Sequence, residues 1–434
     1  MRISEIILVL TSVLALSCKT EKKETFEKFQ FALPEEVGMS SDSLANIESM
    51  VMEFVETKKF PGAVTLIAKD GKIIYESEIG WADSAQTVPY RKNHLFRMAS
   101  MTKPVVSVAA MQLIEAGKIK LNDPVSKYIP SFDSMEIITD FNHEDTTWKE
   151  IPSKIQPTIN HLLNHTSGIP YAFENHGEAI YVKYDIPAFN TYRNWTIANT
   201  MSLLGTLPLA HEPGEKWTYG LSTDVLGRVI EVASGMELDN YVRENITLPI
   251  GANTLDFYFN DSNATANLTP LFIADYKTSS EGQFVPFRLP DHPLYDVNYP
   301  VSGSKTYFSG GTGMTGTARD YFLFCQVMLN DGKLGHSRIL KPETAQIMHQ
   351  NQIDTISYPW GPHVFGYGFS VATSDHPNTP IGTYGWGGTY STDFWIDPKN
   401  RLIVIQLRQV AFSGNKDDIT SRLEKIVYSA FVKS

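Results

Sequence analysis

Apolar and polar residues follow a helical spacing near the start of the chain. Leu44, Ile47, Val51 and Phe54 recur every three or four positions within the stretch SSDSLANIESMVMEFVETKKF. This spacing puts them on one face of a helix, and the Ser and Asp residues ahead of Leu44 are good helix caps. The pattern therefore predicts an amphipathic helix that packs its apolar face against the rest of the protein.

Strand-like runs lie at both ends of the chain. The stretch GAVTLIAKDGKIIYESEIGWA holds two β-rich runs joined through Asp70-Gly71, which is a typical hairpin turn. The stretch STDFWIDPKNRLIVIQLRQ holds two more runs, joined through Asp397-Pro398, and an amphipathic helix follows from about residue 418. The sequence between these ends is mostly typical of helices and loops.

These patterns predict an α/β fold with an all-α lobe. One antiparallel sheet is built from both termini and flanked by helices, and a helical insertion lobe covers roughly residues 105–300. No repeat and no Gly/Ser-rich or Pro-rich linker divides the chain. Residues 36–434 are therefore expected to form a single domain.

The first residues have the character of a targeting segment. In MRISEIILVLTSVLALSC, Arg2 precedes an apolar run that is too short to span a bilayer but fits a signal peptide over residues 1–17. Cys18 stands where a bacterial lipobox places its acylated cysteine, and the polar residues 18–35 then form a tether. A buried N-terminal helix is the weaker interpretation. We expect an exported, membrane-anchored lipoprotein on the periplasmic or outer-membrane face of a bacterium.

Charge and cysteine usage narrow the choice of partners. The chain of 434 residues has a net charge of −11, which argues against a nucleic-acid partner because phosphate binding needs a basic surface. After Cys18 only Cys325 remains, so no internal disulfide can form and the core must hold the fold. Cys325 lies in an apolar stretch and is expected to be a small buried side chain.

A serine precedes a buried helix in the stretch RMASMTKPVVSVAAMQLIEAGKI. Ser100 lies three positions ahead of Lys103, and the following run is apolar nearly all round until Gly117. Such a helix is buried, and Pro104 fits near its start. Ser100 and Lys103 then share one face, where the helix N-terminus favours an attacking alkoxide and a developing oxyanion. The alternative is a helix-capping serine beside an exposed lysine.

The same S-x-x-K spacing occurs at two other places. Ser302/Lys305 and Ser413/Lys416 lie in Gly-rich loop sequence with no helix of this kind behind them. Only Ser100 has the context of a nucleophile. The chain has no G-x-S-x-G nucleophile elbow, which excludes the α/β-hydrolase route.

Two further stretches hold candidate partners for Ser100. In EPGEKWTYGLSTDVLGRVIEVASG, Tyr219 lies between a Pro-Gly turn and a helix over 222–233. In GTYGWGGTYSTDFWIDP, Trp386, Gly387 and Gly388 form a Gly-rich approach to an edge strand. Together with S-x-x-K, LLNHTSGIP and SGGTGMTGTARDYFLFCQVMLNDG, these motifs resemble the serine β-lactamase and DD-peptidase superfamily. The resemblance covers nearly all of residues 36–430 and points to the class C branch and the family VIII esterases.

The chain departs from the common motifs of that superfamily at two places. The second motif is commonly Tyr-x-Asn, and Leu221 replaces the Asn here. The third is commonly Lys-Thr-Gly, and here it is W-G-G from Trp386. Family VIII esterases resemble this chain at both places. Tyr219 is thus retained, whereas the lysine that recognises β-lactams is not. For both Tyr219 and Trp386, the alternative role is simple packing.

The resemblance implies an acyl-enzyme mechanism with neither a metal nor an organic cofactor. Ser100 is the expected nucleophile, with Lys103 and Tyr219 as its proton-transfer network. A neutral Lys103 and a Tyr219 phenolate would each serve as the base, and the sequence does not choose between them. The N–H groups of Ser100 and Thr389 are the expected oxyanion hole, and the W-G-G residues are the expected substrate contacts.

The expected function is that of a serine hydrolase, namely a carboxylesterase acting on small acyl esters. The alternative enzymes are a β-lactamase, a DD-peptidase or a D-amino-acid amidase on cell-wall-like substrates. A catalytically silent, cell-wall-binding lipoprotein on the same fold is the alternative from another class. Such a binding module needs none of Ser100, Lys103 and Tyr219, so their retention argues for catalysis.

Overall fold

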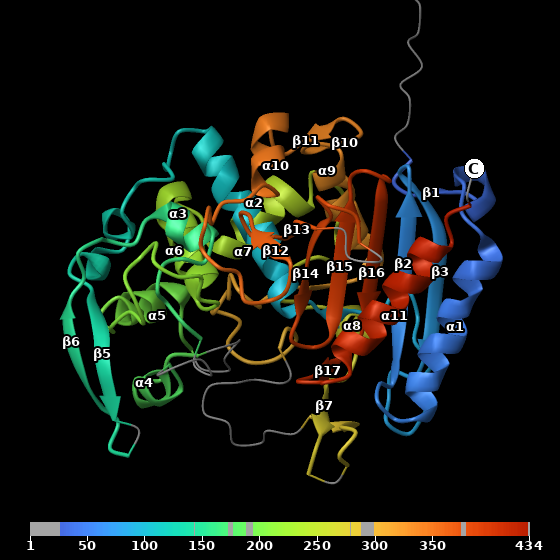
Figure 1. The fold of residues 1–434 in the computed structure, drawn as a ribbon, viewed down its shortest axis with the longest axis horizontal. Helices are drawn as coiled ribbons and strands as arrows, with labels where there is room; N and C mark the ends of the chain where they lie inside the picture. The colour runs from blue at the N-terminus through green and yellow to red at the C-terminus, as the bar shows by residue number, and fades with distance from the viewer. Residues whose placement is uncertain are drawn as a thin grey trace, which may run out of the picture.

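The computed structural model describes residues 27–142, 144–171, 177–187, 194–277, 279–287, 299–374 and 379–432. Within them an eight-stranded sheet has the order β1-β3-β2-β16-β15-β14-β13-β12 and forms the right half of Figure 1. Its strands are β1 (Gln30–Phe31), β2 (Gly62–Lys69), β3 (Lys72–Gly80), β12 (His363–Phe365), β13 (Ser370–Ala372), β14 (Tyr384–Gly388), β15 (Thr392–Asp397) and β16 (Leu402–Leu407).

The two ends of the chain meet in the middle of this sheet. β2 pairs antiparallel with β16, and Gln406 Nε2 donates to Thr65 Oγ1 across the pair at 3.0 Å. The hairpin between β2 and β3 turns through Asp70 and Gly71, which both have positive φ. The predicted antiparallel sheet built from both termini, flanked by helices, is confirmed, with β1 as one parallel addition beside β3.

The prediction that the W-G-G residues lead into an edge strand is wrong. They lie on β14, which has β15 on one side and β13 on the other. β12 and β13 extend the sheet beyond it, so β15 is an inner strand. However, β13 pairs only with Tyr384 and Gly385, so Trp386 to Gly388 continue past the end of their outer neighbour.

The folded region also begins earlier than expected. β1 pairs with β3 through Gln30 and Lys72, which brings part of the expected tether 18–35 into the sheet. The expected signal peptide and Cys18 lie outside the described residues.

Helices cover both faces of the sheet. They are needed on both faces because successive apolar side chains along a strand point to opposite faces. On β2, Leu66 belongs to the core beneath α2 (Thr102–Glu115) and α9 (Ala318–Leu329), whereas Ile67 packs under α1 (Ser41–Glu56) and α11 (Lys416–Ser429). This two-residue period is typical of a sheet buried on both faces. The predicted helix at the N-terminus is α1, and the one after Ser100 is α2 (Figure 1).

A second lobe lies beside the sheet, at the left of Figure 1. It is helical as predicted, with an added hairpin of β5 (Glu136–Asn142) and β6 (Thr147–Pro152). Its helices are α3 (Ile159–Leu163), α4 (Gly177–Lys183), α5 (Ile197–Leu204), α6 (Ser222–Ser234) and α7 (Leu238–Val242). α6 packs on α2, which makes α2 the link between the lobe and the sheet.

Short elements complete the fold around the sheet and the second lobe. They are β4 (Phe96–Arg97), α8 (Ser262–Asn267), β7 (Phe272–Asp275), β8 (Gln283–Pro286), β9 (Thr315–Gly316), β10 (Lys333–Leu334), β11 (Ser337–Arg338), α10 (Pro342–Met348) and β17 (Val410–Ala411). Of these, β4 and β9 pair with one another close to the start of α2.

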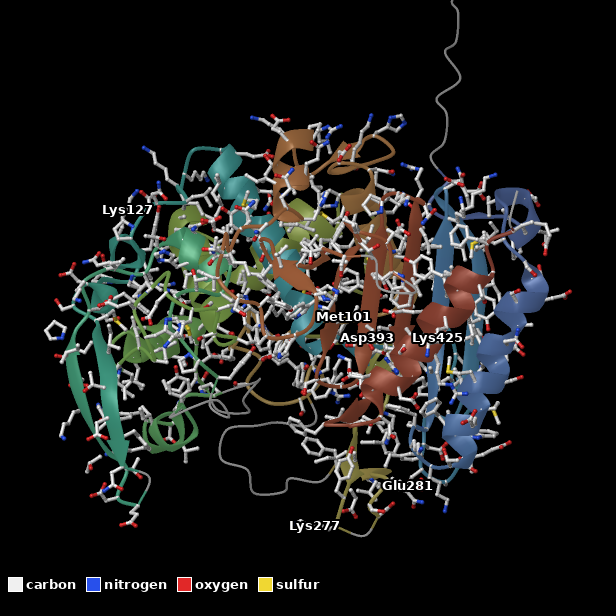
Figure 2. All side chains as sticks on the ribbon, in the orientation of Figure 1. Met101, Lys127, Lys277, Glu281, Asp393 and Lys425 are labelled. Atoms are coloured by element: carbon white, nitrogen blue, oxygen red, sulfur yellow. The ribbon has the colours of Figure 1, made fainter. Side chains whose placement is uncertain are left out.

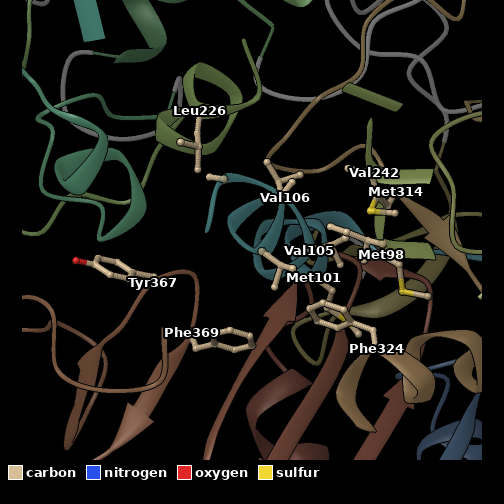
Figure 3. Close-up of a cluster of buried hydrophobic side chains, with 14 of the residues drawn as sticks. Met98, Met101, Val105, Val106, Leu226, Val242, Met314, Phe324, Tyr367 and Phe369 are labelled. Atoms are coloured by element: carbon tan, nitrogen blue, oxygen red, sulfur yellow. The ribbon is translucent and has the colours of Figure 1, made fainter. Parts of the chain in front are cut away.

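The start of α2 lies in the middle of the core. In Figure 2 the labelled Met101 lies inside the molecule, whereas Lys127, Lys277 and Glu281 lie at its rim. Figure 3 shows apolar side chains of α2, α6, α7 and α9 around this point, among them Val105, Leu226 and Phe324. Residues at the N-terminus of α2 are therefore held both by the sheet with its helices and by the second lobe.

Candidate active site

Ser100 lies in a tight turn immediately before α2. The turn is the 3-10 helix η2 (Ala99–Met101), and Ala99 has a φ of 46°, a left-handed conformation that is uncommon for alanine. Neighbouring strands hold the turn: Met98 N donates to Met314 O at 2.9 Å, and Thr392 Oγ1 donates to Met98 O at 3.2 Å. Backbone strain of this kind persists where surrounding structure enforces it, and it clusters at functional sites.

Lys103 is the centre of a buried hydrogen-bond network. Its side chain is fully buried, and its Nζ donates to Ser100 Oγ at 3.1 Å, to Tyr171 Oη at 2.7 Å and to Gly311 O at 3.0 Å. The ammonium also lies 4.5 Å from the centre of the Tyr219 ring. The structure thus brings together all three residues predicted for proton transfer, and adds Tyr171.

Burial makes Lys103 more available as a general base at neutral pH than an ordinary lysine. Removal from water lowers the pKa of Lys103 to about 7, and the charge of Asp224 opposes this shift. Asp224 is itself buried on α6, and burial raises the pKa of its carboxyl, while a hydrogen bond from Ser309 Oγ at 2.7 Å and the charge of Lys103 lower it. A lysine with this pKa is neutral in a large fraction of molecules at neutral pH.

Gly311 leaves room for Asp224 and Lys103 to approach one another. A Cβ at this position would lie 2.6 Å from Asp224 Oδ2 and 3.4 Å from Lys103 Nζ. Any side chain there would push the carboxylate away. Asp224 was not among the predicted site residues; its only sequence signal is an acidic residue on the buried face of an amphipathic helix.

Tyr171 and Tyr219 lie side by side because two loops pack closely. A Cβ on Gly220 would lie 1.9 Å from Ile169 O, so only glycine allows the two backbones to approach as they do. The rings of Tyr171 and Tyr219 are 5.2 Å apart and nearly perpendicular. Sequence reasoning missed Tyr171, although it directly follows the LLNHTSGIP stretch.

Aromatic side chains form one wall of the site. The ring of Tyr219 lies 5.5 Å from Trp386 and 5.3 Å from Trp360, and Trp386 Nε1 donates to Tyr219 Oη at 3.3 Å. Trp217 stacks on Tyr219 with a ring distance of 5.8 Å. Trp386 thus lies where its motif predicts, while Trp360 comes from a loop that no motif marked. Leu221 is buried in the core and does not reach this wall.

β14 passes very close to the turn that carries Ser100. A Cβ on Gly388 would lie 2.5 Å from Met98 O and 3.2 Å from Ala99 Cβ, so the approach requires glycine here. This contact brings Thr389 to the same opening as Ser100, where both line the cavity. The placement fits the predicted pair of oxyanion N–H donors.

These elements enclose one cavity of about 560 Å³. Its lining residues are Ser100, Tyr171, Tyr219, Trp360, Trp386, Gly387, Gly388, Thr389, Ser391, Phe412, Ser413 and Lys416. That volume suits a small molecule rather than a macromolecule. Among the described residues no cluster of three or more His, Cys, Asp or Glu side chains is arranged to hold a metal ion.

The other two S-x-x-K pairs differ from one another in the structure. Lys305 Nζ donates to Phe259 O at 2.6 Å, and neither it nor Ser302 lines the cavity. Ser413 and Lys416 do line it, which their loop-like sequence did not indicate.

Comparison with known proteins adds a family to this geometry. The family model described as Beta-lactamase matches residues 47–425. Esterase EstB of Burkholderia gladioli is 29% identical over 420 residues, which cover 91% of this chain and 98% of that protein. Acyltransferase calJ of Penicillium decumbens is 28% identical over 353 residues, which cover 75% of this chain and 78% of that protein.

Solved structures agree with the sequence comparison. The chain resembles EstCE1, described as a hydrolase with promiscuous acyltransferase activity, with a TM-score of 0.74 and 28% identity. The match covers 89% of this chain and 99% of EstCE1. These relatives are described as hydrolases and acyltransferases, and the cavity that holds Ser100 and Lys103 agrees with that class of chemistry.

Proposed function

This chain belongs to the beta-lactamase family, and we propose that within it the chain is a carboxylesterase that hydrolyses small acyl esters through an acyl-enzyme on Ser100. The observation that carries the proposal is the buried Lys103 amino group, which lies within hydrogen-bond distance of both the Ser100 hydroxyl and the Tyr171 hydroxyl. A serine hydrolase of the esterase type also agrees with EstB and EstCE1 as relatives.

In the proposed reaction Ser100 Oγ attacks the ester carbonyl. Its proton passes to neutral Lys103 directly or through a tyrosine hydroxyl, and the carbonyl oxygen gains negative charge facing the N–H groups of Ser100 and Thr389. The C–O bond to the alcohol then breaks, and the network returns the proton to the leaving oxygen. Water, deprotonated by the same network, cleaves the acyl-enzyme and restores Ser100.

The cavity wall supports an ester over a β-lactam substrate. Trp386, Tyr219 and Trp360 present apolar ring faces, which suit the apolar part of a short acyl or alcohol group. The second-motif amide that could hold a polar substrate group is absent, because its position is Leu221 and that side chain is buried in the core.

We therefore expect p-nitrophenyl butyrate to be cleaved with a kcat/KM about 30- to 5,000-fold above that for nitrocefin, since loss of such polar contacts costs roughly 2–5 kcal/mol. Both values should be measured on one enzyme preparation, with p-nitrophenyl acetate as a second ester. A higher kcat/KM for nitrocefin would contradict the esterase assignment.

We also propose that the mature protein is a lipoprotein attached to the membrane through Cys18. The support is the sequence alone: an apolar run that ends in small residues and a cysteine. Within the described ranges, no helix combines the length and apolar character needed to cross a bilayer.

If Cys18 carries the lipid, Cys18→Ser should move the protein from the membrane fraction to a soluble or unprocessed form. Fractionation followed by immunoblotting measures this, and Cys325→Ser provides the matched control. Membrane association that survives in Cys18→Ser would exclude Cys18 as the attachment point.

A further inference from the structure

A lysine from the last helix reaches the wall of the catalytic cavity. α11 begins at Lys416, whose Nζ donates to Gly388 O at 3.3 Å and lies 3.1 Å from Asp393 Oδ1. A Cβ on Gly387 would lie 2.5 Å from this Nζ. The missing side chain at Gly387 therefore leaves space for an ammonium directly beside the W-G-G strand.

Lys416 brings a cationic side chain to the cavity wall. Of the described residues that line the cavity, it alone carries a charge. Its partner Asp393 is shared with Arg408, which is fully buried and also donates to Ser391 O at 2.6 Å. One carboxylate thus serves two cations, so Lys416 shares Asp393 with Arg408.

The acidic residues next along α11 do not line the catalytic cavity. Asp417 and Asp418 are exposed, and Asp417 lines a neighbouring cavity of about 390 Å³ instead. Lys416 keeps 27% of its side chain accessible. In the described part of the chain, its Nζ donates to Gly388 O and pairs with the Asp393 carboxylate, and an ammonium with three N–H bonds keeps donor capacity for a ligand.

We propose that Lys416 is an anion-binding residue of the catalytic cavity, and that the preferred substrates are esters carrying a carboxylate. The inference rests on the proposed function and narrows its substrate class. The third motif of this chain has Trp386 where a lysine is common, so the cavity receives its cation from a different element. The aromatic wall would contact the apolar part of such an ester and Lys416 would pair with its charged end.

Two pairs of esters test this proposal. On the acyl side, p-nitrophenyl hemiglutarate carries a carboxylate and p-nitrophenyl pentanoate is its neutral counterpart. On the alcohol side, 4-acetoxybenzoate and phenyl acetate form the equivalent pair. The measured quantity is the ratio of kcat/KM, anionic over neutral, so that a general loss of activity cancels.

We expect Lys416→Met to lower this ratio by about 10–100-fold for one of the two pairs, as loss of a hydrogen bond to a charged group does. Lys416→Arg should retain most of the wild-type ratio. Lys425→Met is the matched control, because Lys425 is an exposed lysine on the same helix (Figure 2). The pair that responds identifies the side of the ester on which the anion lies.

The wild-type enzyme provides a test that needs no variant. Raising the salt concentration to about 0.5 M should lower the ratio for the responding pair, because screening weakens an accessible charge pair. If the neutral esters are cleaved but neither ratio changes in Lys416→Met or with salt, the anion site is wrong and the esterase function stands. If the wild-type enzyme cleaves none of the four esters, the proposed function fails and the anion site fails with it.

Discussion

Replacing Ser100 by alanine should lower the turnover of p-nitrophenyl butyrate by about 10⁴-fold or more, because the nucleophile is lost entirely. Labelling by a fluorophosphonate should disappear in the same variant, since the probe reacts with the activated serine. Intact-protein mass spectrometry of the labelled protein measures this directly. Ser413→Ala is a demanding control, because Ser413 lines the same cavity and belongs to the same sequence pattern.

The same substitution should leave the fold almost unchanged. Ser100 Oγ accepts one hydrogen bond from Lys103, and Lys103 keeps Tyr171 Oη and Gly311 O as acceptors in the variant. The loss is therefore worth about 0.5–1.5 kcal/mol, or a few degrees in Tm. If Ser413→Ala or Ser302→Ala removed labelling while Ser100→Ala did not, the assignment of the nucleophile would be wrong.

Tyr219→Phe should reduce kcat by about 10²–10⁴-fold, the usual contribution of a general acid or base. The substitution keeps the ring, which packs between Trp217 and Trp386, and removes only the hydroxyl. Unchanged Tm and unchanged ring packing would show that the effect is chemical. A loss below a few-fold would return Tyr219 to a packing role.

Tyr171→Phe is the informative comparison. The Tyr171 hydroxyl lies 2.7 Å from Lys103 Nζ and the side chain is almost fully buried, so we expect it to position Lys103. Because the pKa of Lys103 is lowered to about 7, kcat/KM should rise with pH through that value as the amine becomes neutral. Tyr171→Phe should shift this rise of kcat/KM to a different pH and lower kcat/KM by about tenfold. If Tyr171→Phe loses more activity than Tyr219→Phe, Tyr171 is the proton shuttle.

Local patterns were sufficient to predict the main elements of the fold. The turn at Asp70-Gly71, the apolar helix after Ser100 and the strand pair near Asp397 are each determined by neighbours in sequence. β12 and β13 were missed because HVF and SVA are too short and too mixed to show a period. Their absence from the prediction is why β15 was expected at the edge.

The site was harder to predict where its parts meet only in space. Ser100, Lys103 and Tyr219 stand in recognisable motifs, but Tyr171 ends a stretch that is typical of a loop. Its role depends on Gly220, which lets two distant backbones touch. Lys416 was set aside for a similar reason: the S-x-x-K spacing at Ser413 is uninformative until the sheet brings α11 to the cavity.

The pairing of β2 with β16 has a consequence for the timing of activity. The turn with Ser100 is made early, whereas β14, β15 and α11 come from the last part of the chain. A polypeptide that leaves the ribosome or passes an export channel N-terminus first therefore carries its nucleophile long before it has a cavity. Contacts between such distant segments also form slowly. The nascent chain should thus stay inactive until its final strands emerge and complete the cavity.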